Sequence, residues 1–227
     1  MTSTTDTNLC LSCGKPTAGQ LACGGCGVAT SPPPRNGEVG EAGETDYFSL
    51  FGLPRRLALD PRDLAERYYA LSRRFHPDLW HDRPPAEQQA SVRATALVNN
   101  AYRTLKDPVR RGLYWLSLHG ESLGRDNERV PPELASLVFE VQEKLEELRD
   151  GRAGNDGAAA EREVRAIRDD LRGRMERFAA RLEESFRRDD AAAATGLTET
   201  KAILSELHYV RTLLRDVEKE LEPQWSV

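Results

Sequence analysis

Apolar residues recur along this chain at helical spacing and predict a series of amphipathic helices. Four of them, spaced three or four positions apart, form one stripe over residues 61–75: Leu64, Tyr68, Leu71 and Phe75. This spacing places all four side chains on one face of a helix. Asp60 and Pro61 mark the N-terminus of this helix, because Asp is a favoured N-cap and Pro suits the first helical position. The first clear element is therefore a helix that begins at residue 61.

Further stripes extend the helical pattern to the end of the chain. A long helix is expected from about residue 85 to the Asp-Pro break at 107–108, and a short apolar helix runs on to Gly120. Three longer stripes then predict helices over residues 134–148, 164–186 and 203–221. A loop is expected at 151–157, whereas the alanines around 189–194 fit either a turn or the last helix. No β-strand alternation of useful length is present, so the predicted fold is all-α, ending in an antiparallel three-helix bundle.

Charge is unevenly distributed over these elements. Charged residues make up 30% of the chain and aromatic residues 7%, as in proteins built from charged helices. Residues 46–120 carry a net charge of +4, whereas residues 121–227 carry −7. Two modules of opposite sign indicate docking of protein partners rather than binding of nucleic acid, which favours a strongly basic domain.

No apolar run in the sequence approaches the length of a membrane span, so no membrane association is predicted. The first residues, MTSTTD, have neither a basic segment nor an apolar segment, and they lack the arginines of a mitochondrial presequence. A cytoplasmic location is therefore expected.

Residues 1–30 contain the cysteines and too few large apolar residues to form a core. Four cysteines form two C-x-x-C pairs: Cys10, Cys13, Cys23 and Cys26. Four thiolates in two such pairs match a structural zinc site, and metal binding would then order the segment. Disulfides and an iron–sulfur cluster are the alternatives, of which a cytoplasmic chain disfavours the first. Residues 31–45, with three prolines and three glycines, read as a linker.

The sequence His76-Pro77-Asp78 lies between the first two long helices, after an arginine-rich helix. This arrangement resembles the J domain of DnaJ-class co-chaperones. Three further segments resemble the HscB family in particular: residues 46–54 (DYFSLFGLP), 98–108 (VNNAYRTLKDP) and 110–120 (RRGLYWLSLHG). Some HscB relatives, chiefly those of animal mitochondria, also carry an N-terminal tetracysteine module.

The resemblance implies the following organisation: a zinc-binding module (1–30), a linker (31–45), a J domain (46–120) and a C-terminal bundle (121–227). It also implies a function without enzymatic activity. The J domain would stimulate the ATPase of a DnaK- or HscA-like chaperone, and the bundle would deliver the iron–sulfur scaffold IscU to it. Hydrolysis would be triggered by a change in the conformation of the partner.

The resemblance assigns residues to both tasks. Contacts with the chaperone ATPase would come from His76, Pro77, Asp78, Arg67, Arg73 and Arg74. Contacts with the scaffold would come from Leu134, Phe139, Glu140, Glu143, Glu147 and Tyr209. Three of these glutamates share one helical face, which makes an acidic docking surface with apolar anchors. Ala135 and Ser136 depart from the family, which prefers larger apolar residues there.

Three other functions fit the sequence less well. A general J-domain co-chaperone for other clients remains the alternative, although no Gly/Phe-rich or β-rich client domain is visible. A nucleic-acid-binding module is disfavoured because Lys15 is the only basic residue among the cysteines. An enzyme is disfavoured because the sequence shows neither a nucleophile–base motif nor a phosphate-binding loop.

Overall fold

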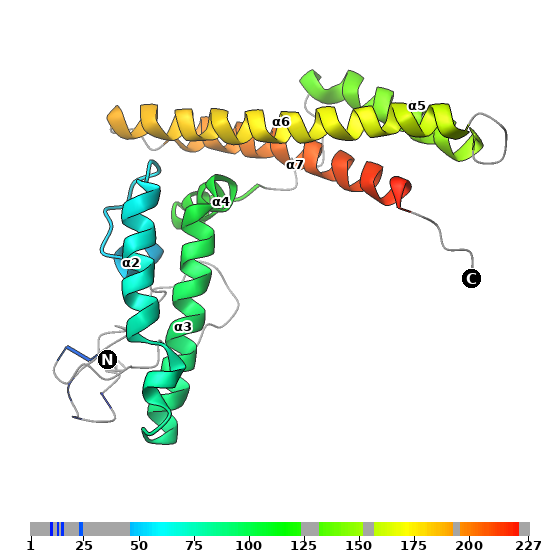
Figure 1. Cartoon of the computed structure of the whole chain (residues 1–227). Helices are drawn as coiled ribbons and strands as arrows, with labels where there is room; N and C mark the ends of the chain where they lie inside the picture. Colours follow the sequence, from blue (N-terminus) through cyan, green and yellow to red (C-terminus); the bar gives the residue numbers. More distant parts are fainter. Residues whose placement is uncertain are drawn as a thin grey trace, which may run out of the picture. The chain divides into compact units, whose positions relative to one another are not determined.

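The computed structural model divides the chain into two compact units, with the boundary between Gly120 and Glu121. The structure describes Cys10, Cys13, Lys15, Cys23, Gly24 and residues 46–123, 132–151, 157–192 and 196–222. All regular secondary structure in these residues is helical, which confirms the all-α class (Figure 1). No helix among them combines the length and the apolar character that a bilayer span requires.

Unit 1 is built on two long helices that lie side by side (Figure 1). Its helical elements are α1 (Tyr47–Leu50), α2 (Pro61–Arg74), the 3-10 turn η1 (Pro77–Trp80), α3 (Pro85–Lys106) and α4 (Pro108–Leu118). Asp60 and Asp107 cap α2 and α4, and each carboxylate accepts one backbone N–H in the first turn, at 2.8 and 2.9 Å. Proline follows each cap at a position that needs no N–H donor. The predicted start of the helix at residue 61 is confirmed.

The core of unit 1 is formed by apolar side chains from all four α-helices and from the loop after α1. Its largest fully buried members are Phe48, Leu57, Leu64, Phe75, Leu105 and Leu116. The two middle residues of the predicted α2 stripe are only half-buried. Tyr68 instead stacks on Tyr102 at a centroid distance of 4.0 Å, and its hydroxyl donates to Asn99 Oδ1 at 3.0 Å. The rim of the α2–α3 hairpin is therefore aromatic and polar.

Unit 2 is a three-helix bundle in which each helix packs against the other two. Its helices are α5 (Ala135–Gly151), α6 (Gly157–Ala191) and α7 (Leu197–Leu221), and the 3-10 turn η3 (Pro132–Leu134) precedes them. The three predicted stripes supply its core, which contains Leu134, Val141, Leu145, Leu148, Val164, Leu171, Val210, Leu213 and Val217. The stripe spacing therefore predicted both the number of these helices and the faces that they bury.

A buried carboxylate supports the turn between α6 and α7. Asp189 is 9% exposed, and its Oδ2 accepts a hydrogen bond from Ser185 Oγ at 3.2 Å. Gly196, the residue before α7, has a φ of +61°, and a Cβ at this position would meet Asp189 Oδ2 at 2.2 Å. Residues 189–191 belong to α6, and α7 begins at Leu197. The close approach of carboxylate and backbone requires glycine here.

We expect Gly196→Ala to lower the free energy of unfolding by roughly 3 kcal/mol, because a strained φ and an overpacked contact act together. The matched control is Gly120→Ala. Gly120 has a φ of +71° but nothing within 4 Å of an added Cβ, so only the backbone strain of about 1–2 kcal/mol applies. Denaturant unfolding followed by helical circular dichroism measures both losses. Equal losses would show that Asp189 does not restrict the turn.

Candidate functional site

The His-Pro-Asp sequence forms an exposed loop between α2 and α3. His76 is the residue before η1, and its Nδ1 accepts a hydrogen bond from the Asp78 backbone N–H at 3.4 Å. The two side chains remain accessible, with 54% of the imidazole and 86% of the Asp78 side chain exposed. Imidazole Nδ1 and carboxylate Oδ2 are 3.5 Å apart. The loop therefore presents both groups to solvent as one compact pair.

Three side chains outside the motif hold this loop in place. The buried Phe75 ends α2, and its carbonyl oxygen accepts hydrogen bonds from Ser91 Oγ at 2.8 Å and from Thr95 Oγ1 at 2.7 Å. Trp80 is also buried, and its indole N–H donates to the carbonyl of Arg74 at 3.3 Å. These donors satisfy carbonyl groups that the end of a helix leaves without partners. The sequence predictions missed this support, although its signal is present as two hydroxyl residues four positions apart on α3, Ser91 and Thr95.

The three predicted arginines differ in their surroundings. Arg73 and Arg74 are exposed in the last turn of α2. Arg67 is half-buried, and its Nη1 donates to the carbonyl oxygens of Phe51 and Gly52 at 2.9 and 3.0 Å. Its Nε donates to Asp63 at 2.7 Å. Arg67 therefore ties the end of α1 to α2, whereas the other two guanidinium groups are open to a partner.

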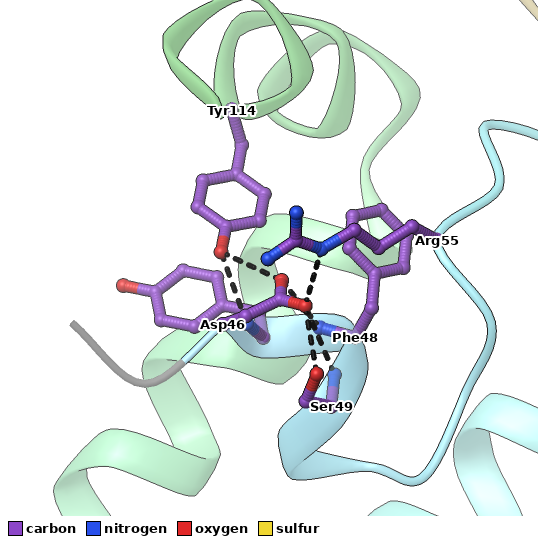
Figure 2. A network of polar contacts seen from close by, with 6 residues as sticks. Asp46, Phe48, Ser49, Arg55 and Tyr114 are labelled. Atoms are coloured by element: carbon purple, nitrogen blue, oxygen red, sulfur yellow. Dashed lines mark hydrogen bonds and ion pairs between the residues drawn. The ribbon is translucent and has the colours of Figure 1, made fainter. Parts of the chain in front are cut away.

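A second polar network holds the start of unit 1 (Figure 2). Asp46 caps α1, and its carboxylate accepts hydrogen bonds from the Phe48 N–H, the Ser49 hydroxyl and Arg55 Nε, at 3.2, 2.9 and 2.9 Å. Tyr114 on α4 donates to Asp46 Oδ1 at 3.2 Å and accepts the Tyr47 N–H at 3.0 Å. This network joins α1 to α4, two elements far apart in the sequence.

The charge of Asp46 is stabilised within this network. Partial burial opposes its ionisation, but hydrogen bonds from Arg55, Ser49 and the Phe48 N–H, with the positive charge of Arg55, outweigh burial and lower the pKa of Asp46. For Tyr114, burial raises the pKa above its ordinary value, so the phenol remains protonated and can donate to the carboxylate.

The residues predicted to bind the scaffold lie on α5, at its start and on α7. Phe139 is 76% exposed, an unusual state for a phenylalanine, and Glu140, Glu143 and Glu147 are also exposed. Glu147 already accepts a hydrogen bond from Lys144 Nζ at 2.7 Å. Exposed apolar and acidic groups therefore occur together along α5.

Leu134 and Tyr209 do not belong to this exposed group. Leu134 is 4% exposed and lies in the core of unit 2, where it begins the apolar stripe predicted over residues 134–148, and its predicted contact with the scaffold stays a prediction. The buried leucine instead packs the entry to α5. Tyr209 is half-buried against the same core, and its hydroxyl oxygen is shielded from solvent.

Three cysteines come together in the N-terminal segment. The sulfur atoms of Cys10, Cys13 and Cys23 lie within 4.8 Å of one another, and those of Cys13 and Cys23 are 3.5 Å apart. Thiolates bound to one tetrahedral ion at ~2.3 Å are ~3.8 Å apart, so this group can hold a metal ion. The fourth predicted ligand, Cys26, lies outside the described residues.

We expect Asp46→Asn to destabilise unit 1 in a pH-dependent manner. A carboxylate whose pKa is lowered by folding stabilises the protein above the unfolded-state pKa, ~3.9, and this contribution is lost as the pH falls through the lowered folded-state pKa. The difference in unfolding free energy between wild type and variant should be constant above about pH 5 and should shrink below it. Denaturant unfolding at a series of pH values measures it. A difference that stays the same down to about pH 2 would contradict this role of the charge.

Comparison with known proteins agrees with this geometry. A family model described as "DnaJ domain" matches residues 46–114. The crystal structure of the human co-chaperone protein HscB is similar, with a TM-score of 0.65 and 28% identity, covering 93% of this chain and 98% of that one. The chaperone HscB from Vibrio cholerae is similar with a TM-score of 0.55 and 28% identity, covering 77% of this chain and 96% of that one. The chain thus contains a DnaJ domain and shares its helical fold and most of its length with these HscB co-chaperones, which supports its assignment as an HscB-like J-domain protein.

Proposed function

We propose that this protein stimulates the ATPase of a DnaK- or HscA-like chaperone through His76, Pro77 and Asp78. The exposed imidazole and carboxylate of the α2–α3 loop carry this proposal. Pro77 has no N–H and starts η1. The hydroxyl groups of Ser91 and Thr95 on α3 hold the Phe75 carbonyl just before the motif. A loop fixed in this way loses little conformational entropy on docking.

The protein contributes no catalytic group in this mechanism. The loop binds the conformation of the chaperone in which ATP hydrolysis is fast, and it shifts the population toward that state. Arg73 and Arg74 extend the docking surface at the end of α2 with two exposed positive charges. These charges speed association with an acidic surface, and salt weakens the effect.

We propose that the exposed face of α5 binds an IscU-type iron–sulfur scaffold. Phe139 is the apolar anchor, because burying its exposed ring against a partner removes a large apolar area from water. Glu140 and Glu143 supply charge at the rim, and Glu147 contributes after release from Lys144. Leu134 supports this face indirectly by packing the start of α5 against the core. Tyr209 packs against the same core from α7.

We propose that the cysteine group holds a structural zinc ion. The sulfur atoms are spaced as ligands of a single ion, whereas the ligands of a four-iron cluster each bind a different iron and are held further apart. A bound zinc ion supplies no redox chemistry and holds the chain segments that carry its ligands together. Cys26 is the proposed fourth ligand.

We expect His76→Gln to return the chaperone's ATP hydrolysis to its basal rate, because the imidazole is lost while the loop is retained. The control is His119→Gln, which changes an exposed histidine at the end of α4. Single-turnover hydrolysis by a DnaK-like chaperone from the same organism measures both variants. Full stimulation by His76→Gln would exclude the proposed trigger.

We expect Phe139→Ala to weaken scaffold binding by about 30-fold, which corresponds to about 2 kcal/mol for a central apolar anchor. Val92→Ala is the control, because Val92 is also an exposed apolar residue (55%) but lies on α3 of unit 1. Calorimetric titration with purified IscU measures both affinities. Equal affinities of wild type and Phe139→Ala would remove Phe139 from the docking surface, without affecting the chaperone proposal.

A further inference from the structure

The three described cysteines are unequally accessible. Cys10 and Cys23 are buried, at 3% and 2% exposure, whereas Cys13 is exposed. Oxidants in solution react with thiolates that they can reach, so exposure decides which sulfur reacts first. The sulfur of the exposed Cys13 lies 3.5 Å from the sulfur of the buried Cys23. One accessible thiol is therefore placed directly beside a second, protected thiol.

We propose that Cys13 is an oxidation site and that peroxide converts Cys13 and Cys23 into a disulfide, which releases the metal ion. This inference rests on the proposed metal site. Since a disulfide bond is ~2.05 Å long, the two sulfur atoms need to approach by only about 1.5 Å. The two cysteines are ten positions apart in the sequence, so the bond would join the two C-x-x-C pairs to each other.

The reaction has two steps. The Cys13 thiolate attacks one oxygen of hydrogen peroxide, the O–O bond breaks, and hydroxide leaves, which gives the sulfenic acid of Cys13. The Cys23 thiolate then attacks the Cys13 sulfur, the S–O bond breaks, and a second hydroxide leaves. The two hydroxide ions take up two protons and become water. One peroxide is reduced by two electrons, and the two thiolates are oxidised by two.

Loss of the metal follows from the ligand count. A disulfide sulfur is no longer a thiolate, and the thiolate is the form that binds zinc. Oxidation of Cys13 and Cys23 therefore removes two of the four proposed ligands at once. Reduction of the disulfide restores them, so the change is reversible as long as Cys13 is not oxidised beyond the sulfenic acid.

The experiment uses the full chain, purified anaerobically with its metal content measured, and titrated with hydrogen peroxide. A chromogenic chelator follows metal release, and non-reducing peptide mass spectrometry locates the cross-link. Chymotryptic cleavage after Leu11 and Leu21 separates Cys10 and Cys13 from each other and from Cys23, and fragmentation distinguishes Cys23 from Cys26. We expect loss of one metal ion per chain together with a Cys13–Cys23 cross-link, both reversed by dithiothreitol and added zinc.

Two variants make the result specific. Cys13→Ser should lose the cross-link and slow the reaction of the remaining thiols, whereas Cys10→Ser, which removes a buried sulfur, should still form the Cys13–Cys23 bond. A first cross-link through Cys10, or peroxide reaction without metal release, would overturn the inference. A protein purified without metal would contradict the zinc proposal and with it the release of metal. The order of thiol oxidation, measured by mass spectrometry, would then still test Cys13 as the first oxidation site.

Discussion

The end of α2 at Phe75 is the constraint on which the candidate site depends. A helix can stop inside a folded unit only if its last carbonyl groups find other donors. The Phe75 carbonyl receives two hydroxyl hydrogen bonds from α3, and Trp80 supplies the donor for Arg74. The chain therefore leaves α2 at a point that hydrogen bonds from α3 and Trp80 fix in position. His76 and Asp78 are therefore exposed to solvent on a short turn that is anchored at its start.

The charged residues of unit 1 divide into an internal group and an external group. Asp46 and Arg67 use their charges to join α1 to α4 and to α2. Arg73 and Arg74 remain exposed beside the loop. Among the exposed basic residues of unit 1, these two lie in the last turn of α2, next to the imidazole and the carboxylate.

Unit 2 shows the same division between structure and surface. Its α5 helix buries Val141, Leu145 and Leu148 in the core and exposes Phe139 on another face. Leu134 supports the helix from the buried side. An exposed phenylalanine loses stability that burial would provide, and the bundle has no need of it for its own core. The cysteine group adds a third accessible feature, in which one of the three clustered cysteines is exposed.

The sequence by itself determined the helices and their order, because apolar spacing, Asp-Pro caps and glycine stops act over a few residues. It also indicated the resemblance to HscB co-chaperones, since the His-Pro-Asp loop and its flanking segments are contiguous in the chain. The functions of single residues depended on distant neighbours. Arg67 was expected to contact the chaperone, and in the structure it holds α1. Leu134 was expected both in an apolar stripe and among the scaffold contacts, and in the structure it lies in the core. Only the tertiary structure decided these roles, because a guanidinium or a leucine follows the same local pattern whether its partner is solvent, another protein or a helix elsewhere in the same chain.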